Sequence, residues 1–229
     1  MSYRRALIVG AGPGLSASLA RRFAREGIAV ALAARRTDRL TALCAETGAS
    51  AHDCDAADPA AVASLFAALD AQGPPDLVVY NASGRTRGPI ADLDPAEVQR
   101  SLQVSAFGAF LVAQQAARRM LPNGHGAIAL TGATAGVKGF ALSAAFAMGK
   151  FALRGLAQSL ARELAPRGIH VVHVVIDGGI RAEHYPDPPD RPDSTLDPGA
   201  IADTYWHILT QHRSAWTWEI EVRPWVERF

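Results

Sequence analysis

The stretch LIVGAGPGLSASLARR (residues 7–22) decides the expected fold of this chain. An apolar run ends in a glycine-rich turn and continues directly into a helical pattern. Glycines permit a tight turn and a close approach of the backbone to a ligand, and the first turn of a helix has free N–H groups that bind anions. We therefore expect a strand–turn–helix unit that binds the phosphates of a nucleotide, with contacts at Gly10, Gly12, Gly14 and Leu15. The alternative is a loop that turns without a ligand.

The rest of the chain repeats this alternation of strand and helix. Continuous apolar runs of strand length occupy residues 5–10, 28–34, 76–80, 127–132 and 169–176. Helical patterns occupy residues 15–27, 37–48, 59–73, 95–121 and 143–164. Strands that are apolar without alternation are buried on both faces, as in a parallel sheet covered by helices. The order predicts a single doubly wound α/β domain of the Rossmann-like type over residues 1–229, with right-handed crossovers.

The pattern changes once, at YPDPPDRPDSTLDPG (185–199). Five prolines among carboxylates cannot form a packed element, so this segment is expected to be a loop. It is too short to separate two domains, and a helical pattern (200–211) and a strand pattern (215–222) follow it. A loop of this length after a sheet strand is either a lid over a site or a solvated insertion.

Composition and length exclude several classes of protein. The chain has 229 residues, a net charge of +1 and 49% apolar residues, as expected of a globular domain with one core. The near-zero charge gives no field that would attract nucleic acid. No apolar stretch reaches the ~18 residues of a membrane span, and the apolar run near the start is too short for a signal peptide. Cys44 and Cys54 lack a metal-site spacing, so we expect reduced thiols, no bound metal and a cytoplasmic protein.

The end of the second predicted strand indicates which dinucleotide is bound. The sequence there is ALAARRTDRL (31–40). NAD-binding proteins usually have a carboxylate at this strand end for the ribose diol, whereas here Arg35 and Arg36 follow the strand. Guanidinium groups suit a 2′-phosphate, which accepts charge-assisted hydrogen bonds. We therefore expect NADP(H), with NAD(H) as the alternative; a third reading is that the arginines only begin the next helix.

With these features in place, the sequence resembles the short-chain dehydrogenase/reductase family along nearly all of its length. The glycine turn is similar to the family's TGxxxGxG, with Val9 for the threonine and Ser16 for the last glycine. The sequence YNAS (80–83) is similar to the family's NNAG, with Asn81 and Ala82 retained. The resemblance implies the Rossmann-like fold already expected and an oxidoreductase that uses a nicotinamide cofactor.

Two further segments extend the resemblance. Asp55 in HDCDAAD (52–58) matches the family aspartate after the third strand, which contacts adenine. IDGGI (176–180) lies where the family has a Pro-Gly turn beside the nicotinamide, with Gly178 in place of the proline. The resemblance thus implies cofactor contacts at Asp55, Asn81, Ala82, Gly179 and Ile180.

The family's catalytic positions mostly hold other residues in this chain. Lys150 matches the family lysine, which implies that it donates a hydrogen bond to the nicotinamide ribose. Four residues earlier, where the family has its tyrosine, the chain has Phe146. Ala133 stands at the family serine and Ser105 at the family asparagine. Other positions also depart from the pattern, which favours a natural divergence over two deliberate silencing substitutions.

These replacements remove the usual proton donor. Phenylalanine has no proton to give, and alanine cannot hold a carbonyl oxygen by a hydrogen bond. Ser143 lies seven residues before Lys150, where one branch of the family has a tyrosine. Other residues that could approach the cleft, or could simply be surface or capping residues, are Thr134, Lys138, Tyr80, His184 and Tyr185.

Two functions remain open. The first is an NADP(H)-dependent oxidoreductase acting on a small organic substrate, such as a conjugated alkene or an imine, that demands less of the missing acid. The second is a catalytically silent NADP(H)-binding sensor or regulatory subunit. The helical stretch 144–161 is apolar almost all round, so by analogy with the family we expect a homodimer or homotetramer. The tail SAWTWEIEVRPWVERF (214–229) carries three tryptophans, which belong either to an interface or to the core.

Overall fold

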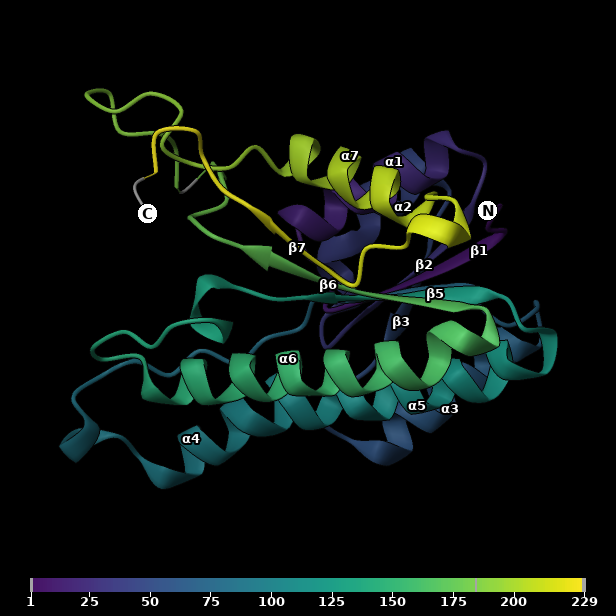
Figure 1. Ribbon diagram of the computed structural model, residues 1–229, viewed down its shortest axis with the longest axis horizontal. Helices are drawn as coiled ribbons and strands as arrows, with labels where there is room; N and C mark the ends of the chain where they lie inside the picture. Colours follow the sequence, from purple (N-terminus) through teal and green to yellow (C-terminus); the bar gives the residue numbers. More distant parts are fainter. Residues whose placement is uncertain (1, 184, 228–229) are drawn as a thin grey trace.

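Over the described residues, 2–183 and 185–227, the computed structural model forms a seven-stranded parallel sheet with helices on both faces (Figure 1). The strand order is β3-β2-β1-β4-β5-β6-β7, and every neighbouring pair is parallel. The strands are β1 (Arg5–Val9), β2 (Ala29–Ala34), β3 (Ser50–Asp53), β4 (Leu77–Tyr80), β5 (Gly126–Thr131), β6 (Ile169–Ile176) and β7 (Glu219–Val222). The predicted doubly wound α/β fold in a single domain is confirmed.

Helices cover the sheet in two layers (Figure 1). One layer consists of α1 (Leu15–Arg25), α2 (Thr41–Thr47) and α7 (Pro198–Leu209). The other consists of α3 (Pro59–Asp70), α4 (Pro95–Leu102), α5 (Gly108–Met120) and α6 (Ala144–Leu164). Short helical turns join these elements: η1 (Thr37–Leu40), η2 (Ile90–Asp92), η3 (Gln103–Phe107), η4 (Leu121–Asn123), η5 (Thr134–Gly136), η6 (Ala165–Arg167) and η7 (Arg213–Ala215).

Two apolar clusters form the core, one on each face of the sheet. The first packs α1 and α7 onto the strands and includes Phe23 and Tyr205. The second packs α3, α5 and α6 onto the other face and includes Phe66 and Leu153. Strands β4, β5 and β6 are buried along their whole length. Burial on both faces explains why the sequences of these strands are continuous apolar runs.

The helical pattern predicted over 95–121 is interrupted in the structure. The π-helical turn η3 separates α4 from α5. Tyr80 donates its phenolic O–H to the carbonyl oxygen of Val104 in this turn. A Cβ on Gly108 would lie 2.5 Å from that hydroxyl oxygen, so only glycine fits there. The wholly buried Tyr80 therefore supports η3 and does not reach the cleft.

The proline-rich segment forms the loop between β6 and α7, and α7 (Pro198–Leu209) begins two residues earlier than the pattern predicted. The carboxylate of Asp187 accepts hydrogen bonds from the backbone N–H and the hydroxyl of Thr195, at 2.8 and 2.6 Å. The backbone N–H of Leu196 donates to the carbonyl of Gly179 at 2.8 Å. Asp197 then caps α7. These bonds tie the far end of the loop to the end of β6.

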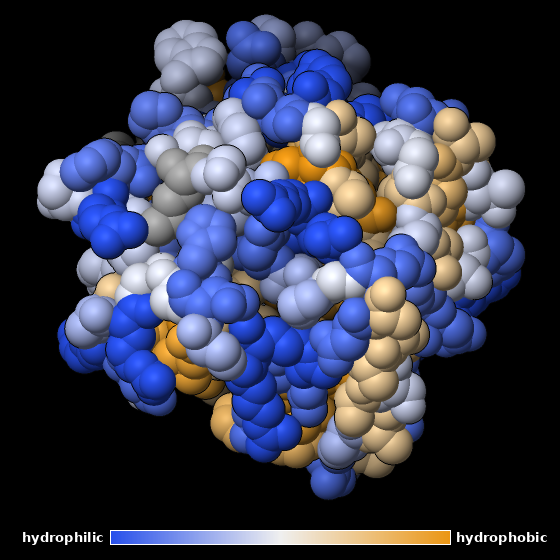
Figure 2. All heavy atoms as spheres, turned by 90° about the vertical axis from the view of Figure 1, so that its right-hand side faces the viewer, coloured by the Kyte–Doolittle hydropathy of each residue, from blue (hydrophilic) through white to orange (hydrophobic). Residues whose placement is uncertain are grey.

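The parallel sheet brings the loops that follow its strands to one edge. In Figure 1 the strands β6 and β7 point to the left, and the loops after β4 and β6 gather on that side. Chain connections leave β1 and β4 toward opposite faces of the sheet, which opens a crevice between them. Figure 2 shows the opposite edge, where hydrophilic side chains predominate and apolar patches are separate. Among the described residues, no helix is long and apolar enough to cross a membrane.

Candidate functional site

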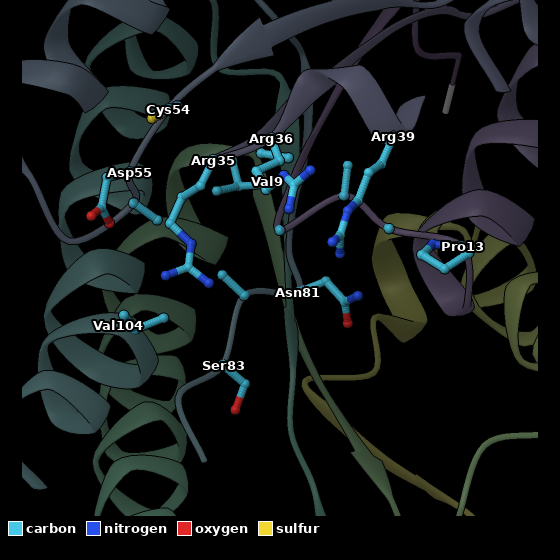
Figure 3. Close-up of a pocket in the computed structure, with 16 residues that line it drawn as sticks. Val9, Pro13, Arg35, Arg36, Arg39, Cys54, Asp55, Asn81, Ser83 and Val104 are labelled. Carbon is cyan, nitrogen blue, oxygen red and sulfur yellow. The ribbon is translucent and has the colours of Figure 1, made fainter. Parts of the chain in front are cut away.

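A cavity of about 660 Å³ lies at the crevice between β1 and β4 (Figure 3). The glycine turn after β1, the arginines after β2, the segment after β3 and the segment after β4 line it. We call it the first cavity. It brings together most of the residues predicted to bind a cofactor, namely Gly10, Gly12, Arg35, Arg36, Asp55, Asn81 and Ala82.

The glycine turn leaves open space where a ligand could lie. Gly10 has φ 86°, and a Cβ there would lie 2.3 Å from the backbone nitrogen of Ala82, so the two segments touch. A Cβ on Gly12 would meet nothing within 4 Å. Glycine at position 12 is thus not needed for packing within the protein, which fits a backbone that a phosphate approaches closely.

Two predicted contacts of the turn do not line the first cavity. Gly14 is the N-cap of α1, which has no side-chain cap, and Leu15 is buried against the core. The free N–H groups at the start of the helix are therefore the part of this segment that can face an anion. Leu15 contributes packing.

A hydrogen-bonded chain that was not predicted from the sequence joins the turn to β4. The amide of Asn81 donates to the hydroxyl of Ser16 at 2.7 Å, and that hydroxyl donates to the carbonyl of Gly10 at 3.0 Å. The backbone N–H of Asn81 donates to the carbonyl of Val9 at 2.8 Å. Ser16, which departs from the glycine of the family pattern, therefore stabilises the turn.

Three arginines line the first cavity, one more than predicted. Figure 3 shows Arg35, Arg36 and Arg39 with their guanidinium groups directed into it. Arg36 pairs with the exposed Asp38 at 2.9 Å. Arg39 lies on the tight turn η1, three residues after Arg36, which precedes that turn in an extended conformation. That spacing is the signal in the sequence that could have indicated Arg39.

Asp55 is held as a carboxylate at the rim of the first cavity. One oxygen accepts from the guanidinium of Arg100 at 2.5 Å, and the other accepts from the backbone N–H of Ala57 at 3.0 Å. Partial burial alone would raise the pKa of Asp55, but these two hydrogen bonds and the positive charges of Arg100 and Arg35 lower it below its ordinary value. The group is thus an acceptor at neutral pH.

A second cavity of about 650 Å³ adjoins the first and shares Asn81 and Ser83 with it. The end of β5, the turn η5, the start of α6 and the segment after β6 form its walls. Lys150 lies in this second cavity, only 3% exposed, and donates from Nζ to the carbonyl of Thr131 at 2.7 Å. Burial, with a smaller contribution from the positive charge of Arg85, lowers the pKa of Lys150 to about 7.

Phe146 lies one helical turn before Lys150 and lines the same cavity. Its ring centroid is 5.9 Å from the Lys150 ammonium and 4.9 Å from the guanidinium carbon of Arg85. Ala133 also lines the second cavity, as do the predicted contacts Gly179 and Ile180. Ser105 lines neither cavity; it is fully buried in η3, where its hydroxyl accepts from the N–H of Gly84 at 3.0 Å.

Comparison with known proteins identifies the family. Residues 4–185 match the family model described as short chain dehydrogenase. The chain belongs to the short-chain dehydrogenase family. It is 34% identical over 97% of its length to a crystal structure of a short-chain dehydrogenase from Rhodopseudomonas palustris, of which it covers 99%, with a TM-score of 0.84.

Two more of these similar proteins bear on function. A metagenomic short-chain oxidoreductase, solved in complex with NADP, is 30% identical over 96% of this chain and 97% of that chain, with a TM-score of 0.85. A cyclic-di-GMP-binding biofilm dispersal mediator protein of Escherichia coli is 34% identical over 182 residues, which are 79% of this chain and 74% of that protein.

Some of the alternative proton donors named from the sequence line the second cavity of this short-chain dehydrogenase, and others do not. Ser143, Thr134 and Tyr185 line it, and the hydroxyl of Thr134 donates to the carboxylate of Asp177 at 2.5 Å. Lys138 is exposed over the ring of Phe140 and does not line it. His184 lies outside the described residues. Among the described residues that line this cavity, Lys150 is the ionisable proton donor that is buried.

Two buried histidines of β6 contribute to packing, away from both cavities. His170 stacks on Trp216 with ring centroids 4.8 Å apart. His173 contacts the carboxylate of Glu219 at 2.9 Å, and Glu219 also accepts from Arg154 at 2.7 Å. The two imidazoles thus have separate partners, because residues three apart in one strand point to opposite faces of the sheet.

Replacement of Lys150 by methionine is expected to change how stability depends on pH. The folded pKa of about 7 lies below the 10.5 of a free lysine, so between these values the unfolded chain binds a proton that the folded chain does not. The free energy of unfolding of the wild type should therefore rise relative to that of Lys150→Met as pH increases from about 7 to about 10.

Urea denaturation across this pH range measures the difference. Lys138→Met, which removes an exposed lysine, is the matched control. A constant difference between wild type and Lys150→Met over the whole range would show that Lys150 is not held in a desolvated state.

Proposed function

We propose that this short-chain dehydrogenase is an NADP(H)-dependent oxidoreductase that acts on a small organic substrate. The observation that carries the proposal is the first cavity, where an open glycine turn faces the three guanidinium groups of Arg35, Arg36 and Arg39. The NADP complex of the metagenomic relative supports the same cofactor. NAD(H) remains the alternative at the same cavity.

The residues of the two cavities fit a dinucleotide that spans both. The turn around Gly12 and the start of α1 would hold the pyrophosphate, and the arginines would hold the 2′-phosphate. Asp55 would accept from the adenine, and Asn81 with Ala82 would contact the sugar between the cavities. When bound, the nicotinamide supplies or accepts a hydride.

The second cavity would hold the nicotinamide end and the substrate. The backbone around Gly179 and Ile180 would contact the ring, and Lys150 would donate from Nζ to the ribose. We extend the proposal to the loop 185–197, whose Tyr185 lines this cavity, as a lid over the substrate. Amide hydrogen exchange in this loop, followed by mass spectrometry, should slow on addition of NADPH.

We also infer that the family's usual proton donor is absent, because Phe146 and Ala133 occupy the tyrosine and serine positions. Positioned acid–base groups typically contribute 10²–10⁴-fold to rate, so ketone reduction would be slow. A substrate with a conjugated double bond, or an imine that is already protonated, requires less of an acid. Lys150 is the group in the cavity whose pKa lies near neutrality, and as an ammonium it is also able to release a proton there.

The E. coli relative favours a second candidate function. Its name describes a protein that binds a cyclic dinucleotide and mediates biofilm dispersal. A chain with a cofactor cavity but without the usual acid could likewise act as an NADP(H)-binding sensor or regulatory subunit. Cofactor binding without turnover would distinguish this function from the first.

NADPH is expected to bind more tightly than NADH. Arg35→Gln and Arg39→Gln should each weaken NADPH binding by roughly 10–100-fold and leave NADH binding nearly unchanged, because a hydrogen bond to a charged group contributes ~1.5–3 kcal/mol. Titration followed by tryptophan fluorescence and by melting temperature measures both cofactors. Arg118→Gln, at an exposed arginine of α5 outside both cavities, is the control. Equal affinities for NADPH and NADH, or no response to either, would contradict the proposal.

The double variant Phe146→Tyr with Ala133→Ser is expected to gain NADPH-dependent ketone reduction by ~10²–10⁴-fold over the wild type. The reason is that a phenol one turn before Lys150 would face the cavity that Phe146 now lines. NADPH oxidation with panels of ketones, enones and imines measures the gain. Phe151→Tyr, at a half-exposed phenylalanine of the same helix, is the matched control. A double variant that binds NADPH but shows no gain would mean that Phe146 is not at the catalytic tyrosine position.

We also propose that the chain forms a homodimer or homotetramer through the outer surface of η3, α5 and α6. Four large apolar residues lie there with 42% to 52% of their surface exposed: Phe107, Phe110, Met148 and Phe151. Light scattering should report a dimer or tetramer, and Phe110→Glu with Phe151→Glu should dissociate it, because buried carboxylates oppose association. Ile90→Glu, at a more exposed site in η2, is the control. A monomeric wild type would contradict this proposal.

A further inference from the structure

The loop after β4 carries two arginines along the wall of the second cavity. Arg85 and Arg87 both line it. The backbone N–H of Gly84 donates to the hydroxyl of Ser105 at 3.0 Å, and the N–H of Gly88 donates to the carbonyl of Leu142 at 3.1 Å. The segment that carries the arginines is thus fixed at both ends to walls of the site.

Close packing also holds the first of these ends. A Cβ on Gly84 would lie 2.5 Å from the Cα of Ser101 in α4, so the loop backbone rests directly on that helix. Ser105 lies one turn further, in η3. The residue at the family's asparagine position therefore positions the loop that precedes Arg85, instead of facing the cavity.

The guanidinium of Arg85 is oriented by an aromatic ring and has no acidic partner. Its central carbon lies 4.9 Å from the centroid of the Phe146 ring. Within residues 2–183 and 185–227, Arg85 makes no ion pair or hydrogen bond, whereas Arg36 pairs with Asp38 and Arg100 with Asp55. Its N–H donors are free to bind a ligand.

The charges around the second cavity are all of one sign. Its described lining contains Arg85, Arg87 and Lys150, and no aspartate or glutamate. The nearby Asp177 accepts from Thr134 and pairs with an arginine of the C-terminal segment, so its carboxylate already has partners other than Arg85 and Arg87. A bound anion would offset the mutual repulsion of these cations.

We propose that the substrate of the second cavity is a short carboxylic acid whose carboxylate is bound by Arg85, with Arg87 adding to the positive field. A planar guanidinium matches a carboxylate with two parallel N–H···O bonds, which a lysine cannot do. Arg85 and Lys150 lie near the same Phe146 ring, so the carboxylate and the reacting group would be only a few bonds apart. This inference rests on the proposed oxidoreductase function and narrows its substrate class to α,β-unsaturated acids and α-imino acids, of which an α-oxo acid is a stable analogue.

Calorimetric titration with matched acids and amides tests the proposal. The probes are α-ketovalerate and crotonate, each against its own amide, added to the full-length protein alone and after saturation with NADPH. The wild type should bind each acid at least tenfold more tightly than its amide. Arg85→Gln should weaken binding of the acids by roughly 10–100-fold and leave the amides unchanged, and Arg85→Lys should fall between. Arg118→Gln is the matched control, because Arg118 is exposed and lies outside the cavity.

The outcomes separate this inference from the proposed function. Equal affinity for acid and amide, no binding of either acid, or an Arg85→Gln variant with wild-type acid affinity would overturn it. NADPH binding is measured in a separate titration. If the protein does not bind NADPH, the proposed oxidoreductase function is contradicted, whereas acid binding to the protein without cofactor still tests this inference.

Discussion

The contact between the first and fourth strands is the constraint on which the site depends. Gly10 lies so close to Ala82 that no side chain fits between them, and the bonds from Asn81 to Ser16 and Val9 fix the two segments in register. The crevice opens at this point because the chain leaves the two strands toward opposite faces of the sheet. Both cavities share Asn81, so a shift of this contact would move them together.

Burial of Lys150 illustrates how the fold holds a charged group beside an apolar helix. Taking an ammonium out of water is unfavourable, and here the carbonyl of Thr131 is its nearest acceptor. The adjacent Arg85 adds repulsion, and together these effects bring the pKa of Lys150 close to neutrality. The structure thus maintains a lysine that can exchange a proton near physiological pH, in the cavity where Phe146 offers none.

Two buried serines have structural roles in this chain. Ser16 links the glycine turn to β4, and Ser105 holds the backbone of Gly84. Both side chains are buried, and both use a small hydroxyl to satisfy backbone groups. These two hydroxyls therefore help to hold the glycine turn and the loop after β4 in this short-chain dehydrogenase.

The sequence alone determined the sheet, its doubly wound order and the residues of the glycine turn. These features depend on local periodicity and on the apolar strands, which a reader can recognise without coordinates. It also indicated Arg35 and Arg36, because they follow the end of the second strand, and the family resemblance added Asp55 and Asn81.

Only the tertiary structure decided what these residues meet. Arg39 joins the first cavity through the tight turn η1, and Arg85 reaches the second cavity through a loop that Ser105 anchors. The side chain of Leu15, a predicted contact, is part of the core, so its backbone N–H at the start of α1 is the group left to face a ligand. The physical reason is that periodicity reports which face of an element is buried, whereas the partner of a loop side chain depends on distances between segments far apart in the chain.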